Sequence, residues 1–330
     1  MQDSQKSDPL VSIYIPVFNA EKTIGKTIAS LLNQTYRNIE IVVVDNCSSD
    51  STRKVVEAFE DSRLRIVVNN VHLPKAEYNW NRCCQYVHGE FMAIFHADDI
   101  YLPEMISHQI DVFKKNPSVG SVFSMANIID ESDQIIGEFR LSRDVKGSEP
   151  YSYLKIFTLT LENGCFFICP SAVLRTGLYE KLLPFRYDQF GSASDLDMWL
   201  RAARCSPIVI LNEKLMNYRV SKTQGTYILN RLRTHETEFF KVADFHIKKY
   251  TGIHDISKDT LSRYDLLRFK DQLIRAVNSR YAGNFKDFMV QLRNIPWFKY
   301  LKNPHFYPLI FRLIIESLFK RNANPYCSLR

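Results

Sequence analysis

The 330-residue sequence predicts an α/β fold, in which a mostly parallel sheet is flanked by helices and followed by a helical C-terminal extension. Three observations support this class. Apolar, β-rich runs alternate with helix-period segments through about the first hundred residues, which is the order of a parallel sheet with right-handed crossovers. Polar clusters follow three of these runs. From about residue 228 the pattern is helical, with basic and aromatic residues interleaved.

The elements of the first half follow from their apolar spacing. Strands are expected at 11–17, 39–45, 64–68 and 90–95, with helices between them at 20–33, 51–60 and 76–88. Ligands of parallel sheets bind beyond the carboxyl ends of the strands. The polar clusters at 16–19, 45–51 and 96–99 all fall there, so together they indicate a site. Each cluster alone could equally be ordinary turn chemistry.

The middle of the chain, residues 119–220, breaks this alternation. Two strands are expected around an acidic turn at 130–133. The remaining expected elements are helices at 151–157 and 192–205, a buried strand at 164–173, and two short strands at 207–211 and 215–220. We expect one large domain over residues 1–225 and a helical, basic and aromatic region over 226–330, with a soft boundary between them.

Composition limits the class of protein. A net charge of +7 is mild and favours anionic partners without selecting one, and no nucleic-acid partner is expected. Seven scattered cysteines lack zinc-finger spacing, which indicates free thiols in a reducing compartment. The first ten residues are polar, and no run approaches the roughly 18 apolar residues of a membrane span. We therefore expect a cytoplasmic protein, with peripheral contact to the inner face of the plasma membrane left open.

Two adjacent carboxylates, Asp98 and Asp99, follow the apolar run that ends at residue 95. Like charges side by side repel each other, and a divalent cation between them removes the repulsion. The stretch HADD therefore predicts a metal site at the end of this strand.

Four motifs stand in a fixed order: VSIYIPVFNAEKTIGKTIASLLNQTYRNIEIVVVDNCSSDST, NRCCQYVHGEFMAIFHADDIYLPEMISHQ, SDLDMWLRAA and YRV. In this order they resemble the inverting family-two glycosyltransferases with the GT-A fold, over about residues 9–220. The resemblance implies a nucleotide-sugar transferase domain at 1–225, with a donor half at about 9–117 and an acceptor half at about 118–225. It also implies a nucleotide-diphosphate sugar donor, taken to be a UDP-sugar, and hexosyl transfer to a glycan or lipid-linked acceptor. Capsule or O-antigen synthesis is the expected pathway.

The resemblance assigns donor contacts to the strand-end clusters. Asp45 would accept the edge of the base, while the loop after the first strand flanks base and ribose. Turn chemistry at Asp45, a helix N-cap at Asn19, a first-turn carboxylate at Glu21 and a helix-surface position for Asn81 are the open alternatives. The full expected donor set is Pro16, Val17, Phe18, Asn19, Glu21, Asp45, Asn81, Ala97 and Asp98.

The metal assignment also follows from the resemblance. Asp98 matches the metal-binding carboxylate that ends the family's Asp-x-Asp element, and the expected ion is Mn²⁺ or Mg²⁺. Asp99 is a second expected ligand, or else the cap of a helix starting near Leu102. His96 takes the first position, where many members have Asp, and its role stays open. Ser221 stands where many relatives have a metal-binding His.

The stretch SDLDMWLR matches the family's pattern for the general base, which makes Asp195 the expected catalytic residue. A helix N-terminus would keep its carboxylate ionised. The local alternative is a capping box formed by Ser194 and Asp197. Trp199 could support the acceptor or belong to the core. Downstream, Arg219 and Lys222 could neutralise the diphosphate, or water could complete the metal shell.

Two other functions remain open at this point. A sugar-phosphate nucleotidyltransferase has a similar sheet and metal, but it typically shows a Gly-rich first loop that PVFNAEKT lacks. A catalytically silent GT-A-like binding protein is the second alternative. The basic and aromatic tail could contact a membrane surface, pack on the catalytic domain, or form a homodimer.

Overall fold

The computed structural model describes residues 8–86, 88–221, 233–251 and 255–295, together with residues 297, 307 and 311. The chain divides into two compact units. One comprises Met1–Thr160 with Cys165–Arg219, and the other comprises Leu161–Gly164 with Val220–Arg330. The expected domain boundary at residue 225 falls within 222–232, outside the described residues.

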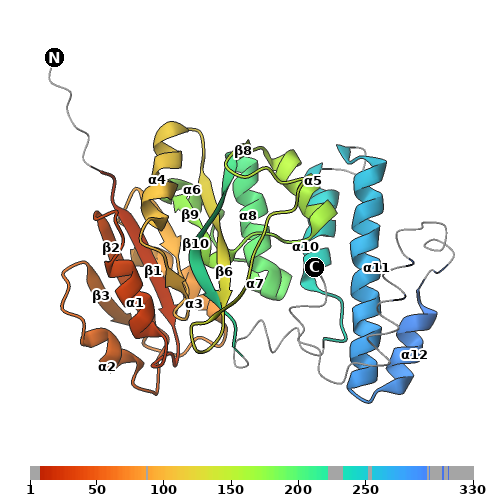
Figure 1. Cartoon of the computed structure of the whole chain (residues 1–330), viewed down its shortest axis with the longest axis horizontal. Helices are drawn as coiled ribbons and strands as arrows, with labels where there is room; N and C mark the ends of the chain where they lie inside the picture. The colour runs from red at the N-terminus through yellow and green to blue at the C-terminus, as the bar shows by residue number, and fades with distance from the viewer. Residues whose placement is uncertain are drawn as a thin grey trace. The chain divides into compact units, whose positions relative to one another are not determined.

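The described residues of the larger unit form a ten-stranded sheet in the order β3-β2-β1-β4-β9-β6-β10-β5, with β7 beside β6 and β8 beside β10 (Figure 1). The strands of the first half pair in parallel, as the sequence predicts. The sheet becomes mixed at β9, which is antiparallel to both β4 and β6. The strands are β1 Val11–Val17, β2 Ile39–Asp45, β3 Leu64–Val68, β4 Phe91–Ile94, β5 Ile100–Tyr101, β6 Ser121–Ile129, β7 Ile135–Glu138, β8 Pro150–Tyr151, β9 Val173–Arg175 and β10 Ile208–Arg219.

The helices connecting these strands lie close to their expected places, and some are shorter. The first begins at Ile24, because residues 21–23 form a turn before it. Its buried side chains recur at helical spacing, which is why it packs one face on the sheet. The helices before residue 220 are α1 Ile24–Leu32, α2 Thr52–Glu57, α3 Ala76–Cys83, α4 Met105–Lys115, α5 Tyr153–Asn163, α6 Thr176–Leu182, α7 Tyr187–Phe190 and α8 Ser194–Cys205.

Two expectations for the middle region were wrong. Residues 164–173 do not form a strand. Instead Cys169–Ser171 form a short 3₁₀ helix, and β9 begins only at Val173. Pro170 at the start of that helix explains the difference, because proline cannot donate to a strand ladder. The two short strands expected at 207–211 and 215–220 are one strand, β10, interrupted by irregular register between Leu211 and Met216.

The sheet register brings the three polar clusters to one edge. Val17 at the end of β1 lies beside Asp45 at the end of β2. On the other side of β1, Tyr14 pairs with Ile94, and the Phe95 N–H donates to the Tyr14 carbonyl. The loops that follow β1, β2 and β4 therefore leave the sheet side by side, as the parallel order requires.

The smaller unit is helical among its described residues, with α10 Glu238–His246, α11 Lys258–Tyr281 and α12 Phe285–Arg293. The Ser257 hydroxyl caps α11 by accepting the Thr260 N–H. Phe269, Leu273 and Ile295 form a small core, against which Trp297 packs. Within the described parts of the chain, no helix combines the length and apolarity required to cross a bilayer.

Candidate active site

The loops after β1 and β2 are locked together. The Asn19 side chain accepts the Ser49 N–H at 2.8 Å, and the Asn19 N–H donates to the Ser48 hydroxyl at 2.9 Å. Glu21 accepts the Ser51 N–H at 2.8 Å. Helix α1 follows Thr23 as its N-cap, so the cap proposed for Asn19 and the first-turn carboxylate proposed for Glu21 are wrong. Both side chains instead fix the shape of the paired loops.

A buried carboxylate and an exposed aromatic ring lie at these loops. Asp45 is 2% exposed and accepts the Ser48 N–H and hydroxyl at 3.0 and 2.6 Å, so the expected turn chemistry is present. Phe18 is 48% exposed, and its ring rests against His72 with centroids 4.6 Å apart. An exposed aromatic ring can stack on a flat heterocycle, and a carboxylate can accept a hydrogen bond from an N–H edge.

Asn81, on α3, bonds to the backbone of one distant residue. Its amide donates to the Phe185 carbonyl at 3.2 Å, and its oxygen accepts the Phe185 N–H at 2.7 Å. The helix-surface alternative for Asn81 is therefore wrong. The side chain holds the segment that precedes α7, and its contact with a donor remains a prediction.

The loop of residues 96–99, which includes Ala97, is held by its backbone. The His96 N–H donates to the Tyr101 hydroxyl at 2.8 Å, and the Thr27 hydroxyl donates to the Asp99 carbonyl at 2.8 Å. Phe95 stacks on the Tyr101 ring with centroids 4.1 Å apart. The loop is therefore positioned by α1 and β5, as well as by the strand that precedes it.

Arg219, the last residue of β10, completes this support. It is 3% exposed, and its Nε donates to the Asp98 carbonyl at 2.8 Å while its backbone N–H donates to Asp99 Oδ1 at 2.8 Å. The guanidinium also donates to the Asp130 carbonyl at 2.7 Å and pairs with Asp133. The expectation that this guanidinium neutralises a diphosphate is wrong, because it is buried among protein acceptors. Lys222 lies outside the described residues.

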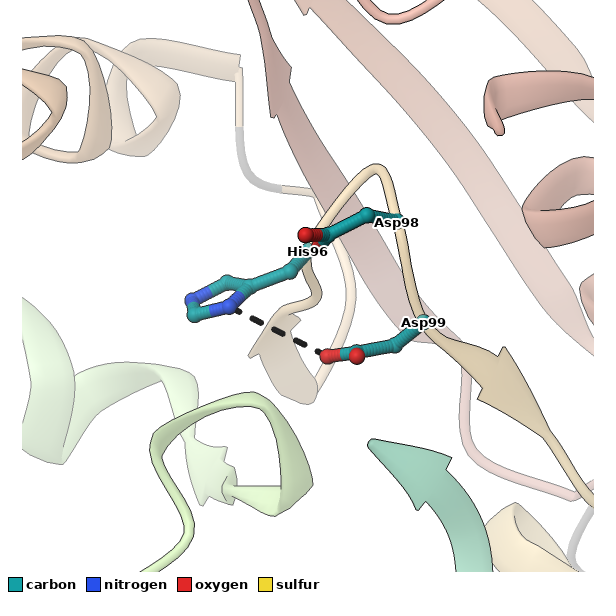
Figure 2. Close-up of side chains that lie close together, drawn as sticks. All are labelled: His96, Asp98 and Asp99. Atoms are coloured by element: carbon teal, nitrogen blue, oxygen red, sulfur yellow. Dashed lines mark ion pairs between the residues drawn. The ribbon is translucent and has the colours of Figure 1, made fainter. Parts of the chain in front are cut away.

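The side chains of this loop gather ligand atoms. The nearest ligand atoms of His96, Asp98 and Asp99 lie within 4.8 Å of one another, and Figure 2 shows the Asp99 carboxylate facing the imidazole. His96 Nε2 and Asp99 Oδ2 are buried, with no hydrogen-bond partner among the described residues. Since buried polar atoms are nearly always paired, these atoms fit a divalent cation. Asp99 does not cap a helix, because α4 begins at Met105.

Electrostatics at the cluster also favour a cation. Burial raises the pKa of Asp99 well above its usual range, and the neighbouring Asp98 charge raises it further. Burial lowers the pKa of His96, which leaves the imidazole neutral, the form that binds metals. Although Arg219 acts in the opposite direction, the net effect disfavours an ionised Asp99, and a bound cation would relieve that penalty.

An aromatic row links the loop to α8. Trp80 stacks on His96 with ring centroids 5.7 Å apart and planes 24° apart. Phe185 packs edge-on against Trp80 at 5.2 Å and against Trp199 at 6.0 Å. Trp199 is buried and also contacts Phe123, so it belongs to the core and does not support an acceptor. Through these contacts the row connects His96 to Trp199 on α8.

Asp195 lies in the first turn of α8 and is partly exposed. Its Oδ1 accepts the Leu196 N–H at 2.7 Å. Burial by surrounding protein raises the pKa of Asp195 to about 6, although backbone hydrogen bonds and the Cys169 thiol act in the opposite direction. Desolvation is the larger effect and outweighs the lowering by the backbone N–H groups at the start of the helix. The carboxylate is still mostly ionised at neutral pH and is more basic than a solvated Asp, which suits a general base.

Cys169 places the two acidic sites near each other. Burial raises the pKa of its thiol, and the charges of both Asp195 and Asp99 contribute to that increase. Both carboxylates therefore lie within electrostatic reach of one sulfur atom.

Asp197, two residues after Asp195, has a different environment. It is 0% exposed and forms ion pairs with Arg186 and Arg201, the latter at 2.9 Å. The expected capping box with Ser194 is wrong, because the Asp197 carboxylate faces these two guanidinium groups. Asp197 therefore anchors α8 to the segment before α7.

Replacing Asp197 with Asn should destabilise the fold. Removing one partner from a buried ion pair leaves uncompensated charge and lowers the free energy of unfolding by about 3 kcal/mol or more. Urea unfolding followed by circular dichroism measures the change. Asp195→Asn is the matched control, because the same chemical change at a site without an ion pair should leave the midpoint nearly unaltered. Equal midpoints for both variants would contradict this role.

Comparison with known proteins identifies the family. The family model described as "Glycosyl transferase family 2" matches residues 12–183. The chain belongs to glycosyl transferase family 2. The resemblance drawn from the motifs is thereby confirmed, and the protein is a glycosyltransferase. Over 238 residues, 72% of this chain and 87% of the relative, it is 30% identical to the Escherichia coli protein named UDP-Glc:alpha-D-GlcNAc-diphosphoundecaprenol beta-1,3-glucosyltransferase WfgD.

Solved structures confirm the GT-A fold of this family 2 enzyme. S. aureus TarS, residues 1–349 in complex with UDP-GlcNAc, superposes with a TM-score of 0.53 at 16% identity, covering 85% of this chain and 90% of that one. The mannosyltransferase PcManGT from Pyrobaculum calidifontis, in complex with GDP-Man and Mn²⁺, gives a TM-score of 0.57 at 16% identity, covering 96% and 89%. At these identities the likeness concerns the fold alone.

Sequence reasoning did not assign roles to two residues of this site. Trp80 lies between Asn79 and Asn81 on the short helix α3. The sequence of this helix gives no indication that the Trp80 ring stacks on His96. Cys169 is only one of seven scattered thiols in the sequence, yet its thiol lowers the pKa of Asp195. Both contacts join segments far apart in the sequence, so no local pattern contains them.

Proposed function

We propose that this glycosyltransferase is metal-dependent and inverting, and that it transfers a hexosyl group from a UDP-sugar to a hydroxyl of a lipid-linked glycan during surface polysaccharide synthesis, such as that of capsule or O-antigen. The observation that carries this proposal is the cluster of His96, Asp98 and Asp99, in which His96 Nε2 and Asp99 Oδ2 are buried without a hydrogen-bond partner among the described residues. The printed substrates of the E. coli relative, UDP-Glc and a diphosphoundecaprenol-linked GlcNAc, support this donor and acceptor class.

The donor end of the site follows from the first two loops. Phe18 would stack on the uracil ring, while Asp45 accepts a base N–H and the locked backbone of residues 16–19 shapes the ribose pocket. Asp98 and Asp99 would hold Mn²⁺ or Mg²⁺. When bound, the ion supplies positive charge against the diphosphate as the glycosidic bond breaks.

The acceptor end is formed by the start of α8. Asp195 would accept the proton of the acceptor hydroxyl as that oxygen attacks the anomeric carbon on the face opposite the leaving diphosphate. The new bond then has inverted configuration, and a nucleoside diphosphate is released. A carboxylate with a pKa of about 6 is suited to hold this proton at neutral pH and return it to solvent.

A donor screen tests the proposal. The full chain is incubated with UDP-, GDP- and dTDP-sugars, Mn²⁺ and a diphosphate-lipid-linked GlcNAc acceptor, and the released products are measured. UDP release that requires the acceptor supports the proposed function. In a parallel incubation with a sugar phosphate and a nucleoside triphosphate, pyrophosphate release would favour the nucleotidyltransferase alternative. No turnover with any donor would favour the silent binding protein.

We also propose contact with an anionic membrane surface. Residues 258–330 contain fourteen Lys and Arg against five Asp and Glu, although the chain as a whole carries only +7. On α12, Phe285, Met289 and Val290 are exposed, which is unusual for large apolar side chains. Basic residues beside exposed apolar ones suit a membrane interface, where a lipid-linked acceptor is found. Most of the tail beyond residue 295 lies outside the described residues.

Liposome sedimentation tests this contact. The wild type should sediment with anionic vesicles and be released by salt, because the attraction is partly electrostatic. The double variant in which both Phe285 and Met289 are replaced by Ser should bind the vesicles less. The control replaces Ile135 and Ile136, which are similarly exposed on β7 of the larger unit. Equal sedimentation of the two double variants would overturn the role of α12.

A further inference from the structure

His96 occupies the position where the family pattern often has a carboxylate, and the structure shows how its ring is held. Its backbone N–H is bound by Tyr101, and Trp80 stacks on the imidazole. Nδ1 lies 3.9 Å from Asp99 Oδ2, too far for a hydrogen bond. Nε2 is buried without a partner among the described residues. The ring is thus oriented by its neighbours, with Nδ1 facing Asp99 and Nε2 left without a hydrogen-bond partner among the described residues.

We propose that His96 is a ligand of the active-site cation and that its imidazole makes the site select Mn²⁺ over Mg²⁺. This inference rests on the proposed metal dependence. It assigns a role to the residue that departs from the family pattern, and it sets the choice between the two ions.

The ligand chemistry gives the direction of selection. Mg²⁺ binds hard oxygen ligands in nearly ideal octahedral geometry and dehydrates reluctantly. Neutral imidazole suits borderline transition ions, whose affinity rises from Mn²⁺ towards Cu²⁺. Exchanging a carboxylate for an imidazole also removes one negative charge, on which the binding of a hard ion depends. Both effects disfavour Mg²⁺ more than Mn²⁺.

The geometry is compatible with joint ligation. The ligand atoms of His96, Asp98 and Asp99 lie within 4.8 Å of one another. At this separation the three side chains could hold one divalent cation between them. Asp99 Oδ1 is already bound by the Arg219 N–H, which leaves Oδ2 turned towards the imidazole.

Two simpler roles explain less. If His96 served only as a packing surface for Trp80, its buried nitrogen would gain nothing over a carbon atom, and burying an unpaired polar group is unfavourable. If His96 and Asp99 formed a plain ion pair, their atoms would approach to hydrogen-bond distance, as Asp197 does with Arg201 at 2.9 Å. A cation between His96 and Asp99 accounts for the orphaned Asp99 oxygen and for the separation of the pair.

Pulsed electron paramagnetic resonance tests the ligand directly. With Mn²⁺ and UDP bound to the full chain, spin-echo modulation should show a coupled ¹⁴N nucleus. His96→Asp should still bind Mn²⁺ but lose this modulation. The matched control is His108→Ala, because that surface imidazole pairs with Glu213 away from the cluster, and its nitrogen signal should match the wild type. Absence of ¹⁴N coupling in the wild type, or its persistence in His96→Asp, would overturn the proposal.

Metal titration tests the selectivity. The ratio of the Mg²⁺ and Mn²⁺ dissociation constants, measured calorimetrically with UDP present, should fall by at least about tenfold in His96→Asp, since even outer-shell changes alter metal affinity by about 10- to 100-fold. An unchanged ratio contradicts the inference. Saturable Mn²⁺ binding that depends on Asp98 but lacks nitrogen coupling refutes the role of His96 and leaves the proposed function intact. No Mn²⁺ binding, with metal-independent UDP release, refutes both.

Discussion

Asp195→Asn should lower kcat by about 10² to 10⁴, the usual contribution of a positioned general base, while the KM for the donor changes little. An amide has the same shape but cannot accept the acceptor proton. The carboxylate lies in the first turn of α8 and accepts a hydrogen bond from Leu196, which an amide oxygen can also accept. The variant should therefore fold normally. Steady-state kinetics with saturating donor and acceptor measure the loss.

The pH profile provides a second measurement of the same group. Burial raises the pKa of Asp195 to about 6. A base must be unprotonated to act, so wild-type kcat should increase as pH rises through about 6 and level off above it. In Asp195→Asn, the residual kcat should no longer rise with pH through about 6. A rise that survives in the variant would assign the titration to another group.

Comparing Asp197→Asn with Asp195→Asn separates an effect on catalysis from an effect on stability. If Asp197→Asn lowered kcat by about 10² to 10⁴ without loss of stability, while Asp195→Asn had only a mild effect, the assignment of the base would be reversed. The structure argues for the present order, because Asp197 is 0% exposed and paired with two arginines.

Asp98→Asn should abolish most transfer while preserving the fold. The cation would lose a charged ligand, and Asn oxygen is a weaker ligand for a hard ion than carboxylate. The loop itself should persist, because Arg219 binds the Asp98 carbonyl, a backbone group that the substitution retains. Transfer assays over a range of Mn²⁺ concentrations, with thermal unfolding as the folding control, measure both effects. Near-normal turnover in chelator-treated buffer would show that the metal role is wrong.

The edge of the sheet could be predicted from the sequence because it depends on local patterns. Each polar cluster follows an apolar run, and parallel pairing necessarily brings the ends of β1, β2 and β4 together. The pKa of Asp195 could not be predicted, since the desolvation comes from residues packed around it in three dimensions. The helix N-terminus, the one feature visible in the sequence, is the smaller effect.

Arg219 shows the same limit for long-range contacts. The YRV motif suggested a cation that could neutralise the diphosphate, whereas the structure shows Arg219 bonded to the backbone of the metal loop. The acceptors of the guanidinium are set by long-range contacts. Strand β10 pairs with β5, and the turn after β6 brings the Asp130 carbonyl to Arg219. The sequence likewise gives no local indication that the two expected strands form one strand, β10, with irregular register between Leu211 and Met216.

The position of Arg219 also limits how relatives of this enzyme can be recombined. The residue lies 120 positions after Asp99 in sequence, yet it bonds to the loop that carries Asp98 and Asp99. The same side chain bonds to the turn at Asp130 and Asp133. A chimaera that exchanges only the donor half would therefore pair one parent's metal loop with another parent's buried arginine and turn. A chimaera designed to change donor specificity should therefore take the metal loop, the turn at Asp130 and Asp133, and Arg219 from the same parent.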